Sequence, residues 1–97
     1  MKKLVRDKII QIIKQDGKKP NYYVAENNEY FKRLKEKLLE EVNEYLEENN
    51  FEELVDIIEI VYALAKFQNF NNLEEMRIEK QNKRGSFNNK HILVIEK

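Results

Sequence analysis

The sequence predicts an all-α fold, an antiparallel helical bundle of about four helices with two short β segments. Three observations lead to this prediction. Only two glycines and one proline interrupt a 97-residue chain in which 37% of the residues are charged and Glu, Lys, Leu and Ile are frequent, a composition typical of helices. Apolar residues recur at helical spacing, and asparagine or glycine stands where each helical pattern stops. The length allows one domain, over residues 1–97.

The apolar periodicity and its breaks define four expected helices. They cover residues 6–16, 27–48 (capped by Asn27 or Asn28), 51–67 (ending at Phe67 or Asn69) and 73–84. Gly17 and Gly85 end the first and the last of them, because glycine tolerates the left-handed backbone that closes a helix. Asn72 and Glu75 have the spacing of a capping box, which predicts the start of the fourth helix.

Two short apolar runs lie outside these helices. Residues 22–25 are aromatic and β-branched, and residues 91–95 form a β-type run that could pair with them. We therefore expect two short strands, one before the second helix and one near the end of the sequence.

The net charge of zero conceals an uneven distribution. Residues 1–20 carry a net charge of +5, residues 36–59 hold ten acids against one base, and residues 60–97 carry +3. A neutral chain of this kind does not suit binding along a nucleic-acid polymer. It could hold a cation in the acidic block and an anion at the flanks, or its charged faces could simply be solvated and paired with one another.

Several classes of site are excluded by composition. The chain has no cysteine and one histidine, His91, which excludes disulfides, thiolate zinc sites and a His-rich metal site within one chain. No stretch has the roughly 20 apolar residues of a membrane span, and the beginning of the sequence is charged where a secretory signal would be apolar. The expected location is therefore the cytoplasm, with no membrane partner.

The second expected helix is amphipathic, with an uneven placement of its acids. Its apolar stripe consists of Phe31, Leu34, Leu38, Leu39, Val42, Tyr45 and Leu46. Glu40 points away from the stripe, as a solvated residue would. Glu41 lies at the edge of the stripe with Glu44 on the same ridge, and Lys37 at i−4 from Glu41 is the nearby base. The carboxylates of Glu41 and Glu44 should repel each other, and a further cation would relieve this repulsion.

The third expected helix is apolar almost all round, so we expect it to be buried on several sides. Glu53 and Asp56 nevertheless fall among its apolar residues, where an unpaired carboxylate costs several kcal/mol. Because one small chain can hardly cover such a helix, we expect a homodimer or homotetramer, with a site that subunits could share.

The two helices each offer a carboxylate pair at i, i+3, namely Glu41 with Glu44 and Glu53 with Asp56. A short loop makes the helices antiparallel neighbours, so the four carboxylates should converge. Oxygen ligands alone suit Mg²⁺ first and Mn²⁺ second. Two alternatives stay open: Glu53 could complete a capping box with Asn50, and Asp56 could pair with a Lys or Arg of another helix.

The pattern Glu40-Glu41-x-x-Glu44 followed by Glu53-x-x-Asp56 resembles the signature of the all-α nucleoside triphosphate pyrophosphohydrolases, a group that includes MazG, the dimeric dUTPases and phosphoribosyl-ATP pyrophosphohydrolase. The resemblance extends to most of the chain. The segments that carry it are residues 3–9 (KLVRDKI), residues 53–64 (ELVDIIEIVYAL) and the basic turn Lys80-x-x-Lys83-Arg84-Gly85-x-Phe87.

The resemblance implies hydrolysis of a nucleoside triphosphate between the α and β phosphates, which gives a monophosphate and pyrophosphate. It implies that Glu41, Glu44, Glu53 and Asp56 hold Mg²⁺ and that Glu40 is the remaining catalytic carboxylate. Glu40 or Glu44 could accept the proton of the attacking water.

The bases of the chain provide candidate phosphate ligands. These are Arg6, Lys8, Lys37, Lys83 and Arg84. Tyr22, Tyr23 and Phe87 could stack on a nucleobase or could belong to the core. Two other functions remain open, a non-catalytic helical oligomerisation module and a nucleotide-sensing protein that has lost turnover.

Overall fold

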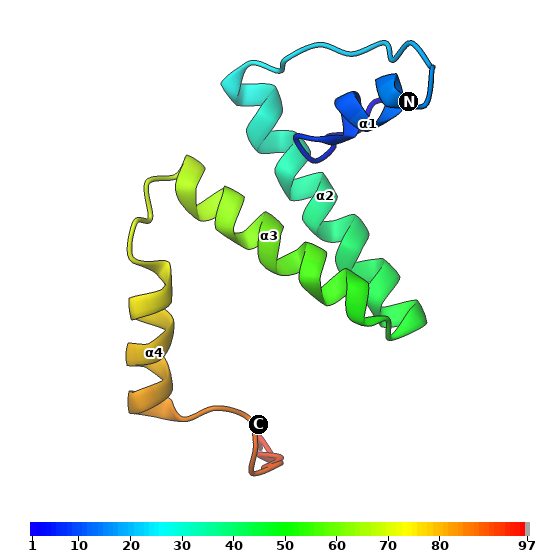
Figure 1. Cartoon of the computed structure of the whole chain (residues 1–97). Helices are drawn as coiled ribbons and strands as arrows, with labels where there is room; N and C mark the ends of the chain where they lie inside the picture. Colours follow the sequence, from blue (N-terminus) through cyan, green and yellow to red (C-terminus); the bar gives the residue numbers. More distant parts are fainter. Residues whose placement is uncertain (97) are drawn as a thin grey trace.

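The computed structural model describes residues 1–96 and contains four helices (Figure 1). They are α1 (Ile9–Gln15), α2 (Asn27–Glu48), α3 (Phe51–Phe67) and α4 (Leu73–Arg84). The predicted all-α class is confirmed, and the three longer helices have the expected bounds. The first helix is shorter than the expected range of 6–16. The expected cap of α2 at Asn27 or Asn28 is wrong, because Glu26 occupies the N-cap position and makes no side-chain capping hydrogen bond. Lys97, the last residue of the predicted domain, lies outside the described residues. No helix within residues 1–96 is long and apolar enough to cross a membrane.

Local backbone chemistry explains where the helices begin and end. Asn49 adopts the left-handed conformation (φ 54°) after α2, and the Asn50 side chain accepts a 3.0 Å hydrogen bond from the Glu52 amide at the start of α3. Gly85 has φ 84° and ends α4. The capping box expected at Asn72 is wrong, because this side chain makes no capping hydrogen bond in the described structure.

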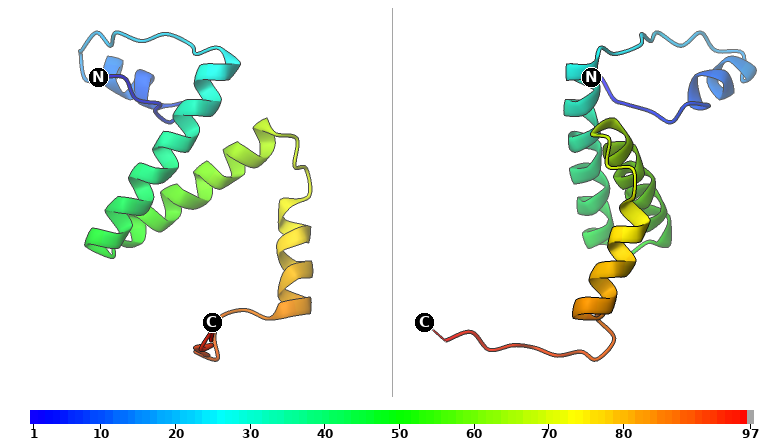
Figure 2. Two further views of the ribbon diagram at one scale, coloured as in Figure 1. Left: turned by 180° about the vertical axis from the view of Figure 1, so that it is seen from behind. Right: turned by 90° about the vertical axis from the view of Figure 1, so that its left-hand side faces the viewer.

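The helices α2 and α3 form an antiparallel hairpin (Figures 1 and 2). At its open end, the Phe67 ring of α3 contacts two rings of α2, with its centroid 5.4 Å from that of Tyr30 and 5.3 Å from that of Phe31. The buried apolar side chains within residues 1–96 all belong to this hairpin, Leu34 on α2 and Ile60 and Ala65 on α3. The hairpin brings the acidic residues of α2 and α3 toward the same region.

The two expected β segments do not form strands in the part of the chain that the structure describes. Residues 22–25 run as coil beside α1, where the Lys14 ammonium lies 5.5 Å from the Tyr22 ring centroid. Residues 91–95 extend away from the helices, and Ile92 is 88% exposed (Figure 2). A strand requires a hydrogen-bonded neighbour, and within one chain the two segments lie at opposite ends of the molecule.

The described chain is more open than a compact domain of its size. Its radius of gyration is 17.7 Å, whereas about 12.5 Å is typical of 97 residues. Its accessible surface is 9345 Å², against about 5,900 Å² for a compact protein of this mass. The helix α4 and the residues after it stand apart from the hairpin (Figures 1 and 2) and account for part of this difference.

Candidate metal centre

Three glutamates of α2 form the acidic cluster: Glu40, Glu41 and Glu44. One carboxylate oxygen from each of them lies within 4.8 Å of the others. Their spacing at i, i+1 and i+4 places them on one side of the helix over little more than a turn. Glu41 is only 6% exposed, and it is the one charged residue that is buried within residues 1–96.

The burial of Glu41 on α2 makes its negative charge energetically costly. Burial raises the pKa of the Glu41 carboxyl, and the nearby carboxylates of Glu44 and Asp56 raise it further. The Lys37 ammonium opposes this effect from 3.6 Å. At that distance Lys37 and Glu41 form an ion pair but no direct hydrogen bond. The Glu41 carboxylate can therefore still bind a cation.

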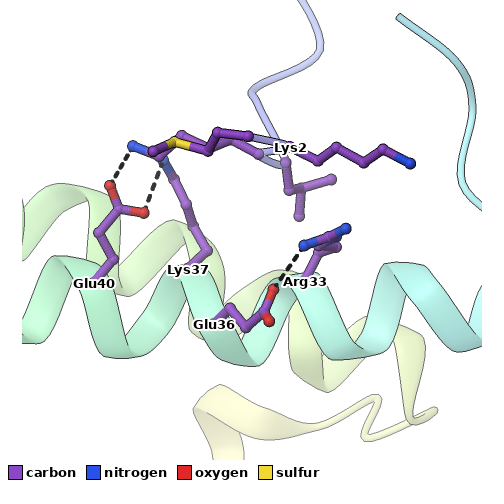
Figure 3. Close-up of a pocket in the computed structure, with 8 residues that line it drawn as sticks. Lys2, Arg33, Glu36, Lys37 and Glu40 are labelled. Atoms are coloured by element: carbon purple, nitrogen blue, oxygen red, sulfur yellow. Dashed lines mark hydrogen bonds and ion pairs between the residues drawn. The ribbon is translucent and has the colours of Figure 1, made fainter.

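Glu40, which the helical wheel places away from the apolar stripe, is half-buried and has basic partners. Its Oε1 accepts a 2.6 Å hydrogen bond from the Lys3 ammonium, and its Oε2 lies 4.0 Å from the Lys37 ammonium. Glu40 lines a pocket of about 140 Å³ above α2 (Figure 3) together with Lys37, Arg33 and Glu36. The hydrogen bond from Lys3 lowers the pKa of Glu40, so that this carboxylate stays ionised. The wheel did not predict the contact with Lys3, because it contains no information about a chain segment that lies above the helix.

The carboxylates of α3 have different surroundings. Asp56 Oδ1 accepts a 2.6 Å hydrogen bond from the Arg6 guanidinium, which also lies 3.5 Å from Glu59. Asp56 therefore has a basic partner, as the alternative expected. The partner is Arg6, which precedes α1 and does not belong to a helix. Glu53 and Asp56 do not belong to the group of three oxygens within 4.8 Å.

Glu53 carries an unpaired atom. Its Oε2 is buried and has no hydrogen-bond partner within residues 1–96. Asn50 caps α3 by accepting a hydrogen bond from the Glu52 amide, and among the described residues the Glu53 carboxylate accepts no hydrogen bond from the Asn50 amide, so the expected capping box does not form. Since a buried carboxyl oxygen without a donor is destabilising, this atom is a candidate cation ligand on α3.

The donor set fits a hard divalent cation. Ligand oxygens bind Mg²⁺ or Ca²⁺ at about 2.0–2.6 Å, so oxygens on opposite sides of one ion are about 4–5 Å apart. The oxygens of Glu40, Glu41 and Glu44 satisfy this limit. The two α3 carboxylates, Glu53 and Asp56, would need side-chain rotation, and Asp56 would also have to leave Arg6. Carboxylates without histidine or thiol favour Mg²⁺ or Mn²⁺.

The predicted phosphate ligands are dispersed. Arg6 and Lys37 lie at the acidic residues. Lys8 is exposed at the start of α1. Lys83 pairs with Glu79 on α4, and α4 stands apart from the cluster, so Lys83 and Arg84 do not reach it within one chain (Figures 1 and 2).

Sequence reasoning missed one contact residue, Lys3. Its signal was present in the complementary charges of residues 1–20 and residues 36–59, but charge alone does not specify which base meets which acid. A second pocket, of about 480 Å³, lies between α1 and residues 22–24 and includes both Tyr22 and Tyr23. Tyr23 donates a 2.6 Å hydrogen bond to Glu29, so its ring is held at this pocket and not in the core.

Comparisons with known proteins yielded no match. No family model matches the chain, and searches of curated proteins and of solved structures likewise found none.

Proposed function

We propose that the protein is a Mg²⁺-dependent nucleoside triphosphate pyrophosphohydrolase that cleaves the α–β phosphoanhydride bond and releases a nucleoside monophosphate and pyrophosphate. The observation that carries the proposal is the buried Glu41, grouped with Glu40 and Glu44 and opposed by Asp56 of α3. A carboxylate of this kind is costly without a cation. The resemblance of the motif to the pyrophosphohydrolase signature supplies the reaction.

The proposed reaction requires orientation and charge neutralisation more than covalent catalysis. A bound Mg²⁺ would lower the pKa of a water and neutralise phosphate charge. Glu41, Glu44, Glu53 and Asp56 are the proposed ligands. Glu40 is exposed enough, with 30% of its side chain accessible, to accept a proton from the attacking water.

The substrate phosphates need cationic partners near the carboxylates. Arg6 and Lys37 are already within reach of them, and Lys8 follows Arg6 closely along the chain. Lys83 and Arg84 can serve a substrate only across a subunit contact. The pocket beside Tyr22 and Tyr23 is large enough for a nucleoside, and Arg6 also lines it, which supports a nucleotide as the substrate.

We also propose that the protein is a homo-oligomer. One face of α3 exposes a stripe of apolar side chains at helical spacing, namely Phe51, Val55, Ile58 and Tyr62. The surface in excess of a compact monomer, about 3,400 Å², is far larger than the roughly 800 Å² that each partner buries in a standard interface. A second copy that covers this stripe would complete the core that one chain leaves open.

A product assay tests the reaction. The protein is incubated with Mg²⁺ and a panel of canonical and modified nucleoside triphosphates, and pyrophosphate and orthophosphate are quantified separately. We expect equal amounts of monophosphate and pyrophosphate, and loss of turnover in Asp56→Asn. Release of orthophosphate alone, or wild-type turnover in Asp56→Asn, would reject the proposal.

The exposed α3 stripe favours one second candidate, a non-catalytic oligomerisation module. The two candidates differ in metal linkage, because a ligand that binds the folded state raises its melting temperature. Mg²⁺ should raise the melting temperature of the enzyme and leave that of the module unchanged. A third outcome, nucleotide-dependent stabilisation without product, would indicate a nucleotide sensor.

Light scattering after size exclusion tests the oligomer. Ile58→Glu should yield monomers, because it places a charge in the middle of the stripe. Val24→Glu is the matched control, since Val24 is equally apolar, 90% exposed and distant from α3 in the sequence. A monomeric wild type, or an Ile58→Glu variant that assembles normally, would contradict the proposed interface.

A further inference from the structure

Within residues 1–96, the segment before α1 makes three ion pairs, all of them to acidic residues of the hairpin. The Lys3 ammonium lies 2.6 Å from Glu40 on α2. The Arg6 guanidinium lies 2.6 Å from Asp56 and 3.5 Å from Glu59, both on α3. Residues 1–6 therefore bridge α2 and α3 at the proposed metal centre.

These contacts have the properties of replaceable pairs. The segment has no helical structure of its own, because α1 begins at Ile9. The side chains of Lys3 and Arg6 remain about half exposed, 48% and 51%. An exposed ion pair is worth little, and the loss of one changes an equilibrium by no more than about fivefold. A divalent cation bound by several carboxylates can therefore displace both.

We infer that Lys3 and Arg6 are internal counter-ions of the acidic centre, which a divalent cation displaces and which then bind the phosphates of the incoming substrate. The inference rests on the proposed function and deepens it. It assigns Lys3 to the site and specifies a polyphosphate as the anion that Lys3 and Arg6 bind. The same two side chains neutralise carboxylates before the metal binds and phosphates afterwards.

The electrostatics of the segment agree with this exchange. Glu40 raises the pKa of Lys3, with smaller contributions from Glu44 and Glu41. Asp56 raises the pKa of Arg6, and Glu59 and Glu41 add to the effect. Both bases are thus attracted by carboxylates that would bind the metal, and a bound metal ion would repel the two bases. Since they remain attached through the chain, they stay next to the site, where the substrate brings negative charge.

Metal affinity provides the direct test. Mn²⁺ binding to the full chain is measured by electron paramagnetic resonance of the free ion, for wild type and for the Lys3→Met/Arg6→Met double variant. Each exposed pair weakens metal binding by between about 1.4-fold and fivefold, so we expect the double variant to bind Mn²⁺ about 2- to 25-fold more tightly. The matched control is Lys18→Met/Lys19→Met, which removes the same charge from exposed residues of the loop after α1. Equal or weaker affinity in the double variant, relative to this control, overturns the inference.

The position of the segment provides a second readout. The chain contains no cysteine, so spin labels can be placed at Val5→Cys and Asn43→Cys without background, and labelled chains can be diluted with unlabelled ones. Diamagnetic Mg²⁺ should lengthen or broaden the distance between the labels. An unchanged distribution at saturating Mg²⁺ also overturns the inference.

Failure of the inference can be distinguished from failure of the proposed function. If Mn²⁺ binds wild type, is lost in Glu41→Gln/Glu44→Gln, and binds the Lys3/Arg6 variant no more tightly, the metal centre stands and the counter-ion role is wrong. If wild type binds no Mn²⁺, or if Glu41→Gln/Glu44→Gln binds it normally, both proposals fail together.

Discussion

The α2–α3 hairpin and the part of the chain from α4 onward both contain apolar residues, about half of the hairpin and about a third of residues 73–97, but use them differently. Every side chain that is buried within residues 1–96 lies on the hairpin: Leu34 and Glu41 on α2, and Ile60 and Ala65 on α3. Residues 73–96 bury none, although Met76, Ile78 and Ile92–Ile95 are apolar.

The difference separates helix formation from core formation. The helix α4 is supported by local contacts, with ion pairs from Arg77 to Glu74 and from Lys83 to Glu79 within single turns. Such contacts favour a helix but bury little surface, and most helical stability in proteins comes from packing. In the hairpin, two apolar helix faces meet and exclude water, and Glu41 is buried there. The following predictions test this contrast, from the largest effect to the smallest.

The largest effect should come from removing the buried charge of the hairpin. Glu41→Gln should lower kcat/KM by about 100-fold or more, because a metal ligand contributes several kcal/mol of charge stabilisation, and should abolish stabilisation by Mg²⁺. Without metal the variant should melt at a higher temperature than wild type, since it relieves a buried charge. Glu75→Gln, on the exposed first turn of α4, is the control and should leave both activity and melting unchanged. Full activity in Glu41→Gln would contradict the assigned site.

Core truncation should affect the two regions unequally. Leu34→Ala should lower the free energy of unfolding by about 2–4 kcal/mol, because Leu34 is 3% exposed. Ile78→Ala in α4 should cost less than about 1 kcal/mol in a monomeric background such as Ile58→Glu. Urea unfolding monitored by circular dichroism measures both values. An equal cost at the two positions would show that α4 has a packed partner in the monomer.

The stability of the metal-free protein should depend on pH through Glu41. Burial, together with Glu44 and Asp56, raises the pKa of this carboxyl, while Lys37 opposes the rise. Because the pKa of Glu41 is higher in the folded state than in the unfolded chain, protonated Glu41 contributes stability. This contribution is fully present below the unfolded pKa and is lost as the pH rises through the folded pKa. The stability advantage of Glu41→Gln over wild type should therefore grow with pH across this window and then level off.

Chemical denaturation in EDTA at a series of pH values measures this advantage. Glu40 contributes the opposite pH dependence of stability, because Lys3 lowers its pKa. Since Glu40 is present in both proteins, most of its contribution cancels from their difference. A difference that is constant with pH would place Glu41 in a solvated environment.

The smallest effect concerns the helix caps. Asn50→Ala should destabilise the protein by about 1 kcal/mol, because the Asn50 side chain accepts the hydrogen bond from the Glu52 amide. Asn72→Ala, at the same position before α4, should cost less than about 0.5 kcal/mol, since its side chain makes no such bond in the described structure. Thermal melts of the two variants compare the caps directly, and equal losses would mean that the caps contribute through backbone conformation alone.

The acidic site was predictable where a single helix determines it. Glu41 and Glu44 share a ridge of α2 at i, i+3, and the burial of Glu41 follows from its place at the edge of the apolar stripe. The environments of Glu40 and Asp56 were not predictable from a helical wheel, because Lys3 and Arg6 reach them from 37 and 50 residues away. A wheel describes the angle of a residue and contains nothing about the segment that lies above it.

The sequence by itself determined the helices of this protein, because periodic apolar residues and the breaks at Asn49–Asn50 and Gly85 act over one or two turns. Only the tertiary structure decided which apolar residues are buried, that residues 22–25 and 91–95 remain unpaired within residues 1–96, and which bases meet which acids. These outcomes depend on contacts between segments far apart along the chain, whose geometry no local pattern contains.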